Sequence, residues 1–339
     1  MQAKNILIIG PAWVGDMVML QSLFIALKQQ NSHANIDVVA PAWSAPVLAR
    51  MPEVRNVIEV DIAHGQLHLG KRVRVGKSLR NLYEQAIVLP RSFKSALIPF
   101  FAKIPQRTAY RGEMRYGLIN DMRPLDEHIY KAVDKFVALG GSKTDIKQAA
   151  KIQFPRLVVD ENKRAVVANK LGVTLKDPSV ALMPGAEFGP SKRWPAKHFA
   201  QLAVKLKLDG YKVYVFGSPK DASIGAEIES LSNGDAKNLC GQTSLEDAVD
   251  LLSLVSVAIT NDSGLMHIAA AVGRPVVVLY GSITPKYTPP LTDNAEIQYL
   301  DLDCSPCWKK ECPYGHYNCM QNLEVSGVYA SAKKLLMKS

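Results

Sequence analysis

The stretch NILIIGPAWVGDMVMLQSLF, residues 5–24, decides how the chain begins to fold. An apolar run from Ile6 to Ile9 ends at Gly10, the loop PAWVG follows, and an amphipathic segment starts at Asp16. A buried strand, a short loop and a helix in this order open a parallel nucleotide-binding unit. Neither usual phosphate signature is present: the loop is not GxGxxG, and Asp16 stands where GxxxxGK[ST] has its lysine.

The aspartate at position 16 admits two interpretations. A carboxylate there would repel a diphosphate, but it suits the removal of a proton from a hydroxyl group. The alternative is that Asp16 only caps the helix that it opens, because aspartate is a good N-cap residue. From the loop alone, the cap is the simpler interpretation.

Strand and helix patterns alternate along the whole chain, which predicts an α/β fold with parallel sheets. The series restarts near residue 178, after a charged stretch punctuated by Pro155 and Pro178. We therefore place the junction at about 155–175 and predict two Rossmann-like domains, 1–160 and 175–339, that face a cleft and bind ligands at the carboxyl ends of their strands. The strand patterns are 5–10, 36–40, 56–60, 86–90, 179–185, 211–217, 257–260 and 275–281, and the helical patterns are 17–30, 77–85, 91–102, 129–139, 161–172, 196–208, 220–232, 244–254 and 263–272.

The net charge of +10 is unevenly distributed. Residues 1–150 hold 20 Lys and Arg against 12 Asp and Glu, whereas the remainder holds 21 against 19. A one-sided positive field favours an anionic partner, although it can also serve solubility alone. No apolar stretch reaches 18 residues and the N-terminus runs directly into a strand pattern, so we expect neither a transmembrane helix nor a signal peptide, and a cytosolic protein.

Two stretches of the second half combine polar residues with strand ends. In MPGAEFGPSKRWPAKHF (183–199), Lys192 and Arg193 lie on a loop beside a helix start, where they could hold phosphate without a metal or form a solvated basic loop. In AITNDSGLMHIAAAVGRPVVVLYG (258–281), Asp262 ends a strand and the following helix start exposes the backbone N–H groups of 263–265, with His267 one turn in. Asp262 could accept sugar hydroxyls, or simply cap the helix, while the helix start stabilises a leaving diphosphate.

Basic residues gather in two runs of the first half. No acid occurs between Asp61 and Glu84, and arginine is well suited to bidentate binding of carboxylate and phosphate. Nucleic acid is the rival partner, but no nucleic-acid motif accompanies the runs, and we expect their charges on βα loops and not on one groove-binding helix. The runs are 64–80, with Lys71, Arg72, Arg74, Lys77 and Arg80, and 91–115, with Arg91, Lys94, Arg107, Arg111 and Arg115.

Four cysteines, Cys304, Cys307, Cys312 and Cys319, form a C-x2-C-x4-C-x6-C pattern that encloses His316. Thiols of a cytosolic protein are usually reduced, which favours a structural metal such as Zn²⁺ over disulfides. The spacing is not that of a standard zinc ribbon, so a merely cysteine-rich loop remains the alternative. Cys240 has the pattern of an ordinary buried residue.

Six of these stretches together resemble the bacterial ADP-heptose:lipopolysaccharide heptosyltransferases of glycosyltransferase family 9, and among them the type II members most closely. They occur in order over residues 5–290, so the resemblance covers most of the chain. The stretches are GPAWVGDMVMLQSLF, APAWSAPVLARMPEV, LPRSFKSALIPFFAKIPQRTAYRGEMRYGLIND, PGAEFGPSKRWP, VFGSPKD and TNDSGLMHIAAAVGRPVVVLYG.

The resemblance implies a GT-B fold and an inverting, metal-independent transfer of L-glycero-D-manno-heptose from ADP-heptose, without a cofactor. The implied acceptor is the first heptose of a heptosyl-(3-deoxy-octulosonic acid)2-lipid A type lipid, which the first domain would reach by peripheral contact with the inner face of the inner membrane. Asp16 then matches the general base and Lys192 the phosphate-contacting lysine. The implied donor contacts are Glu187, Phe188, Lys192, Asp221, Asp262, Ser263, Gly264 and His267, and the expected acceptor contacts are Lys71, Arg72, Arg74, Lys77, Arg91, Lys94 and Arg115.

Other functions compete with this interpretation. Another GT-B enzyme, either a different core glycosyltransferase or a sugar-nucleotide epimerase, would share the fold, but an epimerase would not need the basic first domain. A non-enzymatic binder of anionic lipid or nucleic acid would explain the charge and leave Asp16, Lys192 and the 262–267 turn without a use. A nicotinamide oxidoreductase is disfavoured because GxGxxG is missing.

Overall fold

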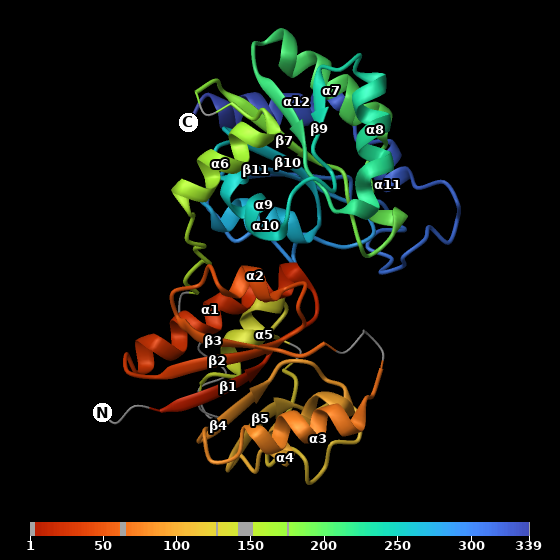
Figure 1. Cartoon of the computed structure of the whole chain (residues 1–339). Coiled ribbons are helices and arrows are strands. Elements are labelled where there is room, and N and C mark those ends of the chain that lie inside the picture. Colours follow the sequence, from red (N-terminus) through yellow and green to blue (C-terminus); the bar gives the residue numbers. More distant parts are fainter. Residues whose placement is uncertain (1–3, 62–65, 127, 142–151, 175, 339) are drawn as a thin grey trace. The chain divides into compact units, whose positions relative to one another are not determined.

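The computed structural model describes residues 4–61, 66–126, 128–141, 152–174 and 176–338. The chain divides into two compact units, an N-terminal unit of residues 1–155 and a C-terminal unit of residues 156–339. Within the described residues, each unit contains one six-stranded parallel sheet that is covered by helices (Figure 1). The predicted α/β fold with parallel sheets is therefore confirmed.

The N-terminal sheet has the strand order β3-β2-β1-β4-β5-β6, the classical order of a doubly wound nucleotide-binding fold. Its strands are β1 (Asn5–Ile9), β2 (Asn35–Ala40), β3 (Val54–Glu59), β4 (Gln85–Val88), β5 (Gln106–Tyr110) and β6 (Asp121–Arg123). Its helices are α1 (Val14–Gln30), α2 (Ala45–Leu48), α3 (Leu69–Ser78), α4 (Leu97–Phe101) and α5 (Ala132–Ala138), with a 3₁₀ turn η1 (Phe93–Ala96).

Alternation along β1 builds the core of this unit on both faces of the sheet. Leu7 and Ile9 join the apolar cluster that contains Ile98 of α4, while Ile6 and Ile8 are buried on the other face. The helices α1 and α5 pack against each other, and so do α3 and α4. Apolar burial on both faces explains why β1 has an almost continuous hydrophobic sequence.

The C-terminal sheet repeats the same topology. Its order is β9-β8-β7-β10-β11-β12, so the fourth strand of the unit again lies beside the first. The strands are β7 (Ser179–Met183), β8 (Lys212–Val215), β9 (Ala236–Asn238), β10 (Val257–Asn261), β11 (Val276–Tyr280) and β12 (Ala295–Tyr299). The helices are α6 (Glu161–Leu171), α7 (Ala196–Leu208), α8 (Ala222–Leu231), α9 (Leu245–Leu252), α10 (Gly264–Ala271), α11 (Asn318–Gln321) and α12 (Val325–Leu336), with 3₁₀ turns η2 (Pro190–Lys192) and η3 (Pro219–Asp221).

The helix predicted at 77–85 is wrong: helix α3 occupies 69–78, and β4 begins at residue 85. The sequence KRVRVGKS alternates basic and apolar residues, and in the folded unit the helix that contains it packs on α4. A Cβ on Gly76 would lie 2.7 Å from the Cβ of Phe101, which shows how closely α3 approaches α4. Strands β5, β6, β9 and β12 and helix α12 are further elements that the patterns did not indicate.

The strand order defines a switch point in each sheet, where the chain leaves neighbouring strands in opposite directions. It lies between β1 and β4 in the N-terminal unit and between β7 and β10 in the C-terminal unit. Loops that follow such strands diverge and leave room for a ligand at the carboxyl edge of the sheet. Asp16 lies in the first turn of α1 after β1, Lys192 lies in η2 after β7, and Asp262 directly follows β10. Three predicted site residues therefore come shortly after switch-point strands.

Candidate active site

The side-chain amide of Asn261 joins the two switch-point loops of the C-terminal unit. Its Nδ2 donates to the carbonyl of Pro184 at 2.7 Å, and its Oδ1 accepts from the backbone N–H of Trp194 at 3.1 Å. Asn261 and Trp194 are fully buried, and the Trp194 indole donates to the carbonyl of Leu323 at 2.9 Å. Both ends of the loop that carries Lys192 are thereby attached to the end of β10.

An ion pair between Lys192 and Asp262 lies at the centre of this site. The Nζ of Lys192 lies 2.6 Å from Oδ2 of Asp262, and the side chains are only 13% and 6% exposed. The ammonium also lies 5.0 Å from the ring centroid of Phe188, a cation–π contact. The other carboxylate oxygen accepts from Oγ1 of Thr288 at 3.5 Å. The structure thus brings together Lys192, Asp262 and Phe188.

His267 is the fourth residue of α10 and is 4% exposed. Burial, with the positive charge of Lys192 as a second cause, lowers the pKa of His267 to about 3. The imidazole is therefore neutral at physiological pH. Its Nδ1 is buried and has no hydrogen-bond partner among the described residues, so the site contains a polar atom that a ligand could satisfy.

The interpretation of Asp262 as a helix cap is wrong. Ser263 is the N-cap residue of α10, its side chain makes no capping hydrogen bond, and Gly264 is the first helical residue. The carboxylate of Asp262 is instead engaged with Lys192 and Thr288. Since no N-cap side chain covers it, the first turn of α10 presents its backbone N–H groups and the positive end of the helix dipole beside the ion pair.

Two other predicted donor contacts, Glu187 and Asp221, bind neighbouring residues of the same unit. Glu187 is exposed and pairs with Lys220 at 2.5 Å. The carboxylate of Asp221 accepts from the backbone N–H and the hydroxyl of Ser218, which closes a capping box at η3. A Cβ on Gly185 would lie 2.7 Å from this carboxylate. Asp221 thus lies against the loop that follows β7.

In the N-terminal unit, Asp16 is the third residue of α1, and Trp13 is the N-cap. The interpretation of Asp16 as the cap is therefore also wrong. The β1–α1 loop is held by Trp43, whose indole donates to the carbonyl of Ala12 at 2.8 Å. Asp16 is partly exposed in the first helical turn, so its carboxylate can contact a ligand.

The basic run that starts at residue 64 does not lie on βα loops, and that expectation is wrong. Lys71, Arg72, Arg74 and Lys77 all belong to helix α3, with Arg74 and Lys77 exposed; residues 64 and 65 lie outside the described part of the chain. Arg91 and Lys94 follow β4, as predicted for a strand-end loop. The exposed Arg74 and Lys77 thus come from one helix, and the exposed Arg91 comes from one switch-point loop.

Arg115 is not on this surface, which corrects its prediction as an acceptor contact. The residue is fully buried. Its guanidinium donates to the carbonyl of Pro90 at 2.7 Å, to the carbonyl of Tyr110 at 2.5 Å and to Oγ of Ser95 at 3.2 Å. Arg115 therefore holds the loop that carries Arg91 and Lys94 from the interior of the N-terminal unit.

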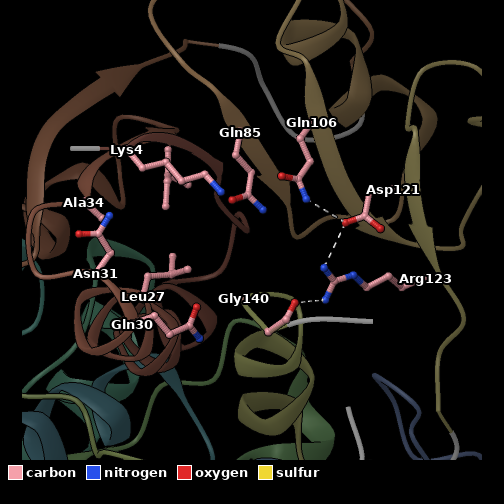
Figure 2. Close-up of a pocket in the computed structure, with 12 residues that line it drawn as sticks. Lys4, Leu27, Gln30, Asn31, Ala34, Gln85, Gln106, Asp121, Arg123 and Gly140 are labelled. Atoms are coloured by element: carbon pink, nitrogen blue, oxygen red, sulfur yellow. Dashed lines mark hydrogen bonds and ion pairs between the residues drawn. The ribbon is translucent and has the colours of Figure 1, made fainter. Parts of the chain in front are cut away.

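A pocket of about 520 Å³ lies at the opposite edge of the N-terminal sheet, where the strands begin (Figure 2). Lys4, Gln85, Gln106 and Asp121 line it, and each stands at or beside the start of a strand. Asp121 accepts from Gln106 at 3.4 Å and from Arg123 at 3.1 Å. Its polar groups mainly bind one another, so this pocket is not the site that the motifs predict.

The four clustered cysteines are free, as is the buried Cys240. Burial and the neighbouring Cys307, Cys304 and Cys312 raise the pKa of Cys319 to about 11. Among the described residues, no group of three or more His, Cys, Asp or Glu side chains is placed to hold a metal ion.

Comparisons with known proteins identify the family of this chain. The sequence profile of glycosyltransferase family 9 (heptosyltransferase) matches residues 72–318. The chain belongs to glycosyltransferase family 9. It is 45% identical to lipopolysaccharide heptosyltransferase 2 of Salmonella typhimurium, with 98% of both chains covered, and 50% identical to lipooligosaccharide heptosyltransferase 2 of Haemophilus influenzae over 86% of this chain and 88% of that one.

A solved structure leads to the same family. The structure of ADP-heptose LPS heptosyltransferase II from E. coli superimposes with a TM-score of 0.88 at 41% identity, covering 98% of this chain and 99% of that chain. The family 9 chain described here is therefore a glycosyltransferase, with the two-sheet architecture of the GT-B heptosyltransferases.

Sequence reasoning did not assign a role to Asn261 or Thr288, which hold the site together. Asn261 directly precedes Asp262 at the end of a strand, and a buried amide at a strand end was the available signal. Thr288 lies 26 residues from Asp262, and no local pattern connects the two.

We expect His267 to make this enzyme sensitive to acid. The folded pKa lies below the ordinary value of 6.5, so protons bind preferentially to the unfolded chain, and stability falls as the pH drops from 6.5 towards 3. Between pH 7 and pH 5 this amounts to about 2 kcal/mol for one histidine. His267→Gln, measured by urea unfolding at both pH values, should lose that part of the difference. The exposed His33, changed to glutamine, is the control, and an unchanged pH dependence in His267→Gln would contradict the assignment.

Proposed function

We propose that this enzyme transfers a heptosyl group from ADP-heptose to the first heptose of the lipopolysaccharide inner core, with inversion and without a metal ion. The observation that carries the proposal is the buried cluster of Lys192, Asp262 and His267 at the switch point of the C-terminal sheet. The names of the similar proteins support heptose as the transferred sugar, ADP-heptose as its donor and lipopolysaccharide as the target.

The proposed task of the C-terminal unit is to hold the donor diphosphate. Lys192 supplies a fixed positive charge, and the N–H groups of Ser263, Gly264 and Leu265 supply donors at a helix start. Asp262 serves as the counter-ion that orients the ammonium, with lone pairs left for a sugar hydroxyl. Because His267 is neutral, it adds no second charge, and its unsatisfied Nδ1 is available to the ligand. Phe188, Glu187 and Asp221 are proposed donor contacts on the neighbouring loops.

The proposed task of Asp16 is general base catalysis. The acceptor hydroxyl attacks the anomeric carbon from the face opposite to the diphosphate and forms the new glycosidic bond, while its proton passes to the carboxylate of Asp16. The bond from the anomeric carbon to the phosphate oxygen breaks, and its electron pair leaves with ADP. Lys192 and the helix start stabilise that developing charge, which assigns the role of a metal ion to the protein's own groups.

The proposed acceptor surface is the exposed basic face of α3 together with Arg91 and Lys94. The acceptor is a phosphorylated, carboxylate-bearing lipid, so cations attract it and Arg can bind it in bidentate fashion. Leu67 and Leu69, which are 47% and 49% exposed, stand beside these charges and suit peripheral contact with the cytoplasmic face of the inner membrane. In the described part of the chain no helix has the length and hydropathy needed to span a bilayer.

The remaining alternatives differ in what they leave unexplained. A nucleic-acid binder gains some support from α3, because its cations share one helix, but it has no use for the buried cluster of the other unit. An epimerase would use that cluster without any acceptor. Whether ADP release depends on an inner-core acceptor therefore separates the proposal from both.

The first test concerns Asp16. Asp16→Asn keeps the shape of the side chain but removes its basicity, so turnover should fall by about 10²–10⁴-fold while ADP affinity stays unchanged. ADP release would be followed for both proteins with ADP-heptose, a one-heptose inner-core acceptor and EDTA. Asp293→Asn, which changes an exposed aspartate of the C-terminal unit, is the matched control. Near-normal turnover of Asp16→Asn would show that Asp16 is not the general base.

The second test concerns the basic face of α3. Neutralising the exposed Arg74 and Lys77 to glutamine should raise the acceptor KM several-fold and reduce its dependence on salt, because screening acts on the attraction that these charges supply. The donor KM should not change. The matched control is the double variant Lys207→Gln and Lys212→Gln, two exposed lysines of the other unit. A change confined to the donor KM would place the acceptor elsewhere.

A further inference from the structure

The cysteine-rich segment packs directly on the turn that carries Lys192. The residues Ser305–Lys310, here called the strap, run across the end of β11 and across η2. The hydroxyl of Ser305 donates to the carbonyl of Gly281, and the backbone N–H of Trp308 donates to the carbonyl of Ser282 at 2.9 Å. The ring of Trp308 meets Tyr287 edge to face, with centroids 5.2 Å apart. These contacts attach the strap to the sheet.

Ser191 connects the strap to the active-site lysine. Its backbone N–H donates to the carbonyl of Lys310 at 3.1 Å, and its hydroxyl contacts the carbonyl of Lys309 at 2.5 Å and Oγ of Ser282 at 2.9 Å. Ser191 is 2% exposed and immediately precedes Lys192. One short residue therefore ties η2 to both the strap and the end of β11.

The backbone of Gly189 lies very close to the strap. A Cβ at this position would lie 2.5 Å from the carbonyl oxygen of Lys310, and φ is +155°. A larger residue would have to displace the strap or the turn. Gly189, Ser191 and the strap carbonyls thus confine η2 from one side, while Asn261 holds the loop at Pro184 and Trp194.

From these contacts we infer that Ser191 is a positioning residue for catalysis, and that the strap exists in this enzyme to aim the ammonium of Lys192. The inference rests on the proposed role of Lys192 as the diphosphate-binding group. Lysine has a long flexible side chain, and a point charge stabilises a leaving group only where its base is fixed. The hydroxyl of Ser191 makes two hydrogen bonds, and its backbone N–H makes a third, so the strand-end turn before Lys192 is held in place.

The test is a double-mutant cycle on ADP binding, measured by calorimetry with the purified full chain. Ser191→Ala should weaken ADP affinity about tenfold and raise the donor KM, with the acceptor KM unchanged. In a Lys192→Met background the same change should cost less than about twofold, because a residue that acts through Lys192 has nothing left to position. Ser232→Ala is the matched control: Ser232 is as buried, and its hydroxyl also makes two hydrogen bonds within this unit.

Each outcome separates the inference from the function on which it rests. An equal loss in both backgrounds would show that Ser191 acts independently of Lys192, which overturns the inference. The inference is also overturned if Ser191→Ala leaves ADP affinity unchanged while Lys192→Met alone weakens ADP binding. In that case the proposed role of Lys192 is retained. If Lys192→Met alone leaves ADP affinity intact, the proposed phosphate contact itself is wrong.

A second variant covers the case in which Ser191→Ala fails to fold. Gly189→Ala pushes against the carbonyl of Lys310 without removing any polar group, so it should weaken ADP binding in the same background-dependent manner. Gly210→Ala is its control, because Gly210 also has a positive φ but a Cβ there would meet no atom within 4 Å. Equal ADP affinities of the Gly189 and Gly210 variants would contradict the inference.

Discussion

One buried amide, that of Asn261, is the contact on which the arrangement of Lys192 and Asp262 depends. Its two ends bind the backbone on both sides of the loop that carries Lys192, and a side chain without that amide would leave a buried carbonyl and a buried N–H unsatisfied. Such an unsatisfied group costs about 1–3 kcal/mol. The loop after β7 therefore has one arrangement relative to β10, and the position of Lys192 beside Asp262 follows from it.

The ion pair between Lys192 and Asp262 is costly to bury. Its surroundings are more typical of a ligand-binding site than of an ion pair that only stabilises the fold. Removing two charges from water costs several kcal/mol per ion, which their attraction offsets only with good geometry and further hydrogen bonds. Here the pair has the ring of Phe188, the hydroxyl of Thr288 and the neutral His267 around it. A low-dielectric setting strengthens every charge interaction with a ligand, so a ligand at this cluster would meet a field that water would otherwise weaken.

The fold was largely predictable because its information is local. Buried parallel strands such as β1, β7 and β11 have continuous apolar sequences, and α7 shows a clear helical period. The site was predictable in part, since Lys192, Asp262 and His267 stand at strand ends and a helix start. What failed was decided by tertiary contacts. Arg115 has the sequence context of a surface cation but is buried among carbonyls, and α3, which begins before the predicted helix, approaches α4 closely at Gly76.

The two sheets share one topology but place opposite charges at equivalent loops. After the first strand of its unit, the chain places Asp16 in the N-terminal unit and Lys192 in the C-terminal one; after the fourth strand it places Arg91 and Lys94 in the first and Asp262 in the second. Under the proposed roles, a carboxylate that accepts a proton is best kept apart from a diphosphate, and a lysine that binds the diphosphate needs a nearby counter-ion when it is buried. Because parallel sheets with the same strand order offer the same loop ends, a change of charge at these few positions is enough to give two like-folded units different chemical tasks.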